Sequence, residues 1–260
     1  MQWCLISESL NQSTHAKGKH GYGSLLRTNG NVTFHHNIYA HHASRSPRPG
    51  TYGDGSILLD FRNNLIYNSA GYSAGDPVRM NYVGNFIKRP RGNVFSVGGE
   101  TTRMYVEGNH LVGGGDANED NWTLIAGAKA CNKMPKPFAV APVVTDSAIK
   151  AYEKMLASCG ASLPKRDAVD ARIIDGVRTD KGDLINTAEQ VGGWPKLEQA
   201  SPPTDTDRDG MPDDWEKTHR FDPTSPADAA KDNDKDGYTN IEEWLNTTDP
   251  TKRVRTQVPR

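Results

Sequence analysis

The feature that most constrains the fold is a repeat within roughly the first 115 residues. A short β-rich run, an asparagine and an apolar pair recur there, with the asparagines at Asn37, Asn64, Asn85 and Asn109. Successive asparagines are 27, 21 and 24 residues apart, a period that fits one coil of a parallel β-helix. Stacked asparagine side chains can form a hydrogen-bonded ladder at the bends. We therefore predict a mainly β fold, a right-handed parallel β-helix, with an antiparallel sandwich as the alternative.

The sequence after the repeats predicts helices and a second domain. Residues 145–160 fit one helix, since Thr145 can cap its start and Gly160 can end it. Its expected apolar stripe is Ile149, Tyr152, Met155, Leu156 and Cys159. Asp167 can cap a second short helix, and residues 180–203 suggest an extended wrap. We expect a β-helix with its helical tail over residues 1–200, a linker near residues 201–204, and a small calcium module over residues 201–250.

Composition narrows the possible partners. No run of 18 apolar residues exists, so we expect no membrane span. Residues 1–112 hold 11 bases and 6 acids, whereas residues 201–250 hold 14 acids and 5 bases. This split predicts an anionic partner other than nucleic acid for the body, and cation binding by the tail. With three cysteines, a disulfide between Cys131 and Cys159 and two unrelated buried thiols both remain open.

Two twelve-residue Asp-rich loops carry the strongest local signal. Oxygen-bearing residues stand at positions 1, 3, 5, 9 and 12 with glycine at position 6, and the second loop begins 27 residues after the first. A hard Ca²⁺ ion takes about 6–8 such oxygens, so this spacing resembles EF-hand calcium loops. The expected Ca²⁺ ligands are Asp205, Asp207, Asp209, Met211 (carbonyl), Asp213, Glu216, Asp232, Asp234, Asp236, Tyr238 (carbonyl), Asn240 and Glu243. A purely structural role for the loops is the alternative, and Trp215 and Trp244 are expected to pack between them.

Basic and histidine-rich segments precede and follow the first repeat. Lys17 and Arg45 are 28 residues apart, close to one coil, so we expect them to face one groove and bind carboxylates of a polyanion. Seven of the eight histidines fall within residues 15–42 or at His110. Zinc binding is the rival interpretation for them, but no ligand spacing supports it, and packing in the coil wall is expected instead.

Several of these segments together resemble the second half of a pectate lyase of polysaccharide lyase family 1. The resemblance is carried by WCLISES (residues 3–9), HAKG (15–18), NVTFHHN (31–37) and RSPR (45–48). KRDAVDAR (165–172) and VGGWP (191–195) are similar to the tail of secreted bacterial members, and the Asp loops to a calcium-binding extension on some of them.

This resemblance implies a calcium-dependent β-elimination that cleaves polygalacturonate (pectate), in a secreted or periplasmic protein. It implies that Arg45 is the base, that Lys17 binds a substrate carboxylate, and that Arg48 is a second substrate arginine. A guanidine base is scarce in neutral form near pH 7, so activity is expected to rise toward alkaline pH.

The resemblance also implies that earlier coils, which hold most of the catalytic calcium ligands, precede the stretch where this chain starts. Glu8 is a nearby acid that matches none of those ligands. We therefore expect a weakly active or inactive fragment of a pectate lyase-like enzyme. The alternative is a non-catalytic module that binds acidic polysaccharide and uses its calcium loops for docking or for structure.

Overall fold

The computed structural model describes residues 1–162, 165–196 and 201–253. Internal contacts divide the chain into two compact units, which are described separately below. The first unit consists of residues 1–141 and 145–196, and the second of residues 142–144 and 197–260.

The first unit is a parallel β-solenoid of about four turns. One sheet has the order β1 (Leu5–Ser7), β4 (Ile38–Ala40), β7 (Leu65–Tyr67), β10 (Phe86–Lys88) and β13 (His110–Leu111). A second has the order β12 (Arg103–Glu107), β9 (Val78–Val83), β6 (Ile57–Arg62) and β3 (Gly30–His35). Two shorter sheets contain β8 (Gly71–Ser73), β11 (Phe95–Val97) and β14 (Ile125–Ala126), and β2 (Leu25–Arg27) with β5 (Arg48–Gly50). Every strand pair is parallel, which confirms the predicted coil architecture and rules out the antiparallel sandwich for this unit.

The predicted asparagine ladder is present at one bend of the solenoid. At each step, the backbone N–H and the side-chain amide of one asparagine donate to Oδ1 of the asparagine one coil further on. The four predicted members are buried, and the sequence analysis missed a fifth, Asn121, which accepts in the same way from Asn109. Such a fully satisfied buried network fixes the register between coils.

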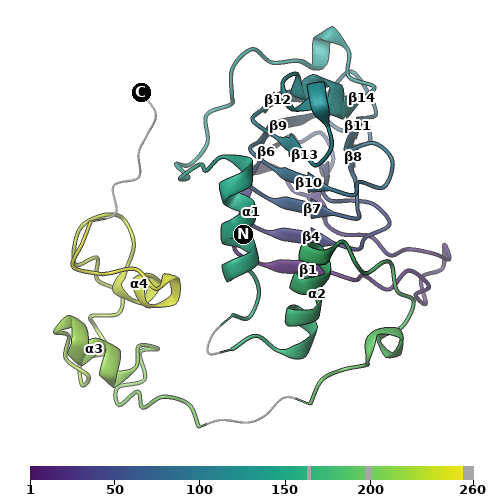
Figure 1. Cartoon of the computed structure of the whole chain (residues 1–260). Helices are drawn as coiled ribbons and strands as arrows, with labels where there is room; N and C mark the ends of the chain where they lie inside the picture. Colours follow the sequence, from purple (N-terminus) through teal and green to yellow (C-terminus); the bar gives the residue numbers. More distant parts are fainter. Residues whose placement is uncertain (163–164, 197–200, 254–260) are drawn as a thin grey trace. The chain divides into compact units, whose positions relative to one another are not determined.

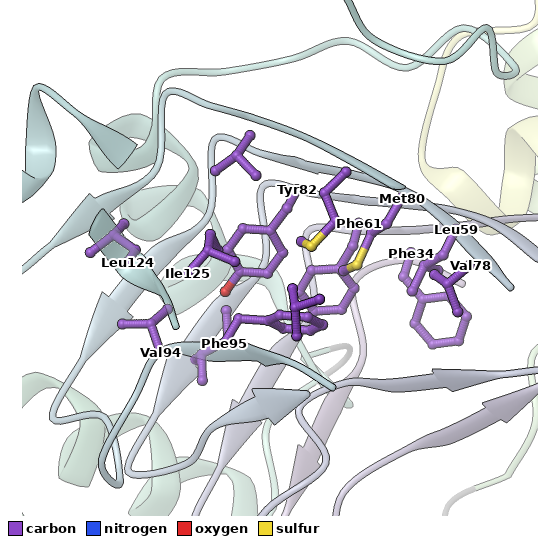
Figure 2. Close-up of a cluster of buried hydrophobic side chains, with 14 of the residues drawn as sticks. Phe34, Leu59, Phe61, Val78, Met80, Tyr82, Val94, Phe95, Leu124 and Ile125 are labelled. Carbon is purple, nitrogen blue, oxygen red and sulfur yellow. The ribbon is translucent and has the colours of Figure 1, made fainter. Parts of the chain in front are cut away.

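Apolar side chains fill the interior of the coil. Phe61 and Tyr82 stack with ring centroids 5.8 Å apart, and Tyr82 contacts Phe95 from another sheet at 5.7 Å. These rings come from successive strands, so each coil contributes one layer of the core (Figure 2).

Two helices cover the outer face of the sheet containing β4, β7 and β10 (Figure 1). They are α1 (Ala148–Ser158) and α2 (Ala168–Thr179). Asp167 caps α2 as predicted, since its side chain accepts from the backbone N–H of Asp170. The predicted start of α1 was wrong by a few residues, because Ser147 rather than Thr145 is the cap. Ile149 was also misplaced in the stripe: it is 54% exposed, while Ala148 and Ala151 are buried in its place.

Short 3-10 helices and free cysteines complete the first unit. The 3-10 helices are η1 (Gly115–Asn118), η2 (Asn121–Leu124), η3 (Ala130–Asn132) and η4 (Ala188–Val191). Cys131 is exposed and Cys159 is buried, where its thiol donates to the His36 carbonyl. All three cysteines are free, so the suggested bond between Cys131 and Cys159 is absent.

The second unit contains two short helices, each following one Asp-rich loop. They are α3 (Asp213–His219) and α4 (Asn240–Asn246). Trp215 and Trp244 pack edge to face with centroids 5.8 Å apart, as predicted. Among the residues that the structure describes, no helix is both long and apolar enough to cross a membrane.

Candidate functional site

Arg45 lies in a tightly constrained turn three residues before β5. Its φ of +66° is in the left-handed region, which is uncommon for a residue other than glycine. Its carbonyl accepts from the N–H of Ser24 at 2.7 Å. Gly23 is needed beside it, because a Cβ atom at Gly23 would lie 2.6 Å from the Arg45 carbonyl oxygen. Strained residues of this kind persist where the surrounding structure fixes them, often at functional sites.

Aromatic residues hold the Arg45 side chain. Its Cζ lies 4.4 Å from the ring centroid of Tyr22, a cation–π distance, and its Nε donates to Tyr72 Oη at 3.4 Å. Tyr22 belongs to the preceding coil and Tyr72 to the following one. The guanidinium is therefore positioned by both neighbouring coils.

Lys17 belongs to the same neighbourhood, which we term the cationic cluster: His15, Lys17, His20, Tyr22 and Arg45. The rings of His15 and His20 stack at 3.9 Å, and those of His20 and Tyr22 lie 4.2 Å apart. Desolvation lowers the pKa of His20, and the charges of His15, Arg45 and Lys17 lower it further. The charges of Lys17 and Arg45 thus act on one imidazole, and Lys17 is itself exposed.

The strand register places Lys17 differently from its predicted position one coil below Arg45. Tyr22 pairs with Ser44, so the offset between coils at this point is 22 residues rather than 28. Lys17 lies instead on an exposed turn before this ladder begins. Its place near Arg45 arises from the fold of that turn, which the spacing argument did not include.

A hollow of about 520 Å³ adjoins the cluster through Tyr72. It runs across three successive coils and is lined by Ala43, Ser44, Ala70, Gly71, Tyr72, Ser73, Arg91, Gly92, Asn93, Ser96, Val97 and Gly98. A hollow that crosses coils suits an extended polymer rather than a compact small molecule.

Arg48, the second predicted substrate arginine, has a protein partner. Its Nη2 lies 3.0 Å from Asp76 Oδ2, and both side chains are mostly buried. A guanidinium bound in this way is less available to a ligand than that of Arg45. Its predicted contact with substrate therefore stays a prediction.

Most of the histidines in the coil wall pack as expected. His42 is buried and bonded to Ser9 Oγ and to the Ile6 carbonyl, and burial lowers its pKa to about 4. His36 contacts Asp146 at 3.2 Å. Glu8 is held by Arg172 through two contacts of 2.6 and 2.8 Å, so its carboxylate is already paired.

The two Asp-rich loops share one hydrogen-bond framework. In the first, Asp205 accepts from the backbone N–H of Arg208 and of Gly210; in the second, Asp232 accepts from those of Lys235 and Gly237. The three alternating aspartates of each loop bring carboxylate oxygens within 4.8 Å of one another. The repeated spacing in the sequence therefore corresponds to a repeated conformation.

The loops differ from EF-hands in what precedes them. An EF-hand has a helix on both sides of the loop, whereas in the described residues 201–253 a helix only follows each loop. Proline explains this, because Pro202 and Pro203 precede the first loop and Pro223 and Pro226 precede the second. The predicted helix–loop–helix pairing is thus replaced by two loop–helix repeats.

The predicted ligands at position 9 make contacts of their own. The carboxylate of Asp213 accepts from Thr206 N and Thr206 Oγ1, both at 2.8 Å, and these bonds lower its pKa. Asn240 donates its amide to the carbonyl of Asp228, while its own Oδ1 is buried without a partner.

At position 12, both Glu216 and Glu243 are buried. Desolvation, followed by the charges of Asp209, Asp207, Asp228 and Asp213, raises the pKa of Glu216 to about 7. Oxygen-only donors with unpartnered buried carboxylate atoms fit a hard cation such as Ca²⁺. The main-chain carbonyls of Met211, which is buried, and of Tyr238, which is exposed, stay predicted ligands.

Comparison with known proteins points to one group of enzymes. The chain is similar to probable pectate lyase C proteins. It is 33% identical over 250 residues to that of Aspergillus flavus, 32% over 247 residues to that of Emericella nidulans, and 34% over 252 residues to that of Aspergillus terreus. Each alignment covers 89% of this chain but only 56–57% of the relative, so the chain spans a little over half of their length. No protein-family model matches the chain.

Proposed function

We propose that this chain is a secreted, pectate lyase-like protein that cleaves polygalacturonate by calcium-dependent β-elimination. The observation that carries the proposal is the similarity to probable pectate lyase C proteins over 89% of the chain. The cationic cluster on a solenoid wall supports it, since a polymer of sugar acids presents carboxylates at regular intervals to such a surface.

The chemistry assigns a role to each of two cations. Neutral Arg45 takes the proton from C5, which lies α to the carboxylate. The electron pair forms the C4–C5 double bond, and the glycosidic oxygen at C4 departs and is protonated by water. Lys17 neutralises the carboxylate as negative charge develops beside it. Calcium, when bound, would supply further charge neutralisation at that carboxylate.

The test of this function follows the unsaturated product by its ultraviolet absorbance, with polygalacturonate as substrate and calcium present. Product formation supports the lyase. Retention of the polymer on immobilised protein without product would instead support binding alone.

Binding without cleavage is the second candidate function, and one observation favours it. Among the described residues, every group of three or more His, Cys, Asp or Glu side chains that converge closely enough to hold a metal ion lies in the second unit. A catalytic calcium site near Arg45 therefore lacks such a group in this chain. In the binding role, Lys17→Ala would release the polymer and Arg45→Ala would not.

We further propose that the loops of the second unit bind Ca²⁺ and that this stabilises the unit. Their converging carboxylates repel one another without a cation. Chelator treatment followed by limited proteolysis tests this, and unchanged protease resistance of residues 201–253 would contradict it.

A further inference from the structure

An acidic side chain from outside both twelve-residue loops reaches the first loop. Asp228 lies twelve residues after Glu216, in the segment between the loops. One oxygen each from Asp209, Glu216 and Asp228 lie within 4.8 Å of one another. This third carboxylate stands outside the sequence pattern that predicted the ligands.

These carboxylates contain buried oxygens with no hydrogen-bond partner. Glu216 is fully buried, and neither of its oxygens accepts a hydrogen bond. Asp209 Oδ2 and Asp228 Oδ1 are likewise buried and unpartnered. A buried carboxylate oxygen without a donor is costly, and a cation held among the three would remove that cost.

The residue at position 9 of the first loop is committed to another task. The carboxylate of Asp213 is taken up by Thr206 N and Thr206 Oγ1 at 2.8 Å, with Lys217 Nζ at 3.7 Å. These contacts fasten the start of α3 to the loop. The first loop therefore has an opening in its ligand set where the sequence pattern places Asp213.

The second loop fixes Asp228 in place. Asn240 Nδ2 donates to the Asp228 carbonyl at 2.8 Å, and the N–H of Asn240 donates to the Lys231 carbonyl at 2.7 Å. Asn240 is the first residue of α4, so the helix that ends the second loop positions an acid of the first.

We propose that Asp228 is a direct ligand of the cation in the first loop and takes the place that the sequence pattern assigns to Asp213. The inference rests on the proposed calcium binding by the loops and specifies its ligands. With Asp209 and the two oxygens of Glu216, Asp228 closes the site from the side that faces away from Asp205. Hard oxygen donors of this kind select Ca²⁺ over softer metals.

The test uses the full chain, stripped of metal and titrated with CaCl₂ in a calorimeter, with two isosteric variants. We expect two calcium sites in the unaltered chain, at least tenfold weaker binding at one of them in Asp228→Asn, and less than threefold change in Asp213→Asn. A tenfold loss in Asp213→Asn together with unchanged binding in Asp228→Asn overturns the proposal.

Thermal melts separate a ligand from a structural residue. Metal-free Asp228→Asn should melt no lower than the metal-free unaltered chain, since it removes a repelling charge, but should lose much of the rise in Tm on adding CaCl₂. A lower metal-free Tm with the calcium-induced rise intact overturns the ligand role. If the unaltered chain binds no calcium at all, the loop proposal itself fails; if it binds two ions and Asp228→Asn binds them equally well, only the assignment of Asp228 fails.

Discussion

The guanidinium of Arg45 lies over the ring of Tyr22, with Cζ 4.4 Å from the ring centroid. The contact joins two successive coils and orients the one arginine to which the proposed chemistry assigns proton transfer. Tyr22 is thus a positioning residue, and its effect should depend on its ring rather than on its hydroxyl.

Tyr22→Leu should lower kcat on polygalacturonate about fivefold, since a cation–π contact contributes about 1 kcal/mol. Tyr22→Phe keeps the aromatic face and should stay within about twofold of the unaltered chain. Steady-state kinetics check this, with KM expected to change little in either variant. Equal losses in both variants would show that the ring does not position Arg45.

The asparagine ladder should contribute strongly to stability. Asn64 donates to the carbonyls of Phe34 and Arg62 and accepts from the backbone and the side chain of Asn37. Asn64→Ala leaves these buried groups unpaired and should cost about 3 kcal/mol. Urea unfolding measures the cost, and the exposed Asn93→Ala serves as the control, with an expected change within about 0.5 kcal/mol. Similar small effects in both variants would mean that the ladder is dispensable.

Buried His42 should make the solenoid sensitive to acid. Burial lowers its pKa from 6.5 to about 4 in the folded chain. The unfolded chain therefore takes up a proton first as the pH falls below about 6.5, and the fold loses up to about 3 kcal/mol by the time the pH reaches about 4.

Urea midpoints at pH 7 and pH 5 measure this loss. His42→Gln should shrink the difference between the two midpoints, whereas Phe34→Leu, a core change with no titrating group, should preserve it. An undiminished difference in His42→Gln would assign the acid sensitivity to other groups.

Removing calcium should act on the second unit alone. Chelation should abolish the near-ultraviolet circular dichroism of the packed Trp215–Trp244 pair, because repelling carboxylates would loosen both loops. The far-ultraviolet signal of the solenoid should change little. A near-ultraviolet spectrum that chelator leaves unaltered, in protein shown to have bound calcium beforehand, would contradict the prediction.

The sequence predicted those features that repeat or follow local rules. The recurrent Asn37, Asn64, Asn85 and Asn109 revealed the coil period, and Asp167 predicted a helix start from cap chemistry alone. Asn121 escaped notice because it follows Asn109 by only 12 residues and lies on a 3-10 turn, outside the period.

What the sequence missed depends on tertiary contacts. Coil offset varies from turn to turn, so the 28 residues between Lys17 and Arg45 did not correspond to the 22-residue step found at Tyr22. Position 9 of the first loop looked like a ligand, but whether Asp213 faces a cation or Thr206 depends on the backbone around it. Asp228 had no pattern to mark it, since its proximity to Glu216 arises from the chain folding back between the loops.

The most direct test of the proposed lyase is the rate of unsaturated product release from polygalacturonate by the full chain in saturating CaCl₂, compared with two arginine variants. Arg45→Ala should lower kcat at least about a thousandfold, as expected for loss of a proton-transfer group in a preorganised site. Arg27→Ala is the matched control, because Arg27 also lies over a tyrosine, at 4.8 Å from the Tyr52 ring, but stands outside the cationic cluster. The account predicts turnover in the unaltered chain and in Arg27→Ala, and essentially none in Arg45→Ala. Turnover that persists in Arg45→Ala, or no product from the unaltered chain, would contradict it.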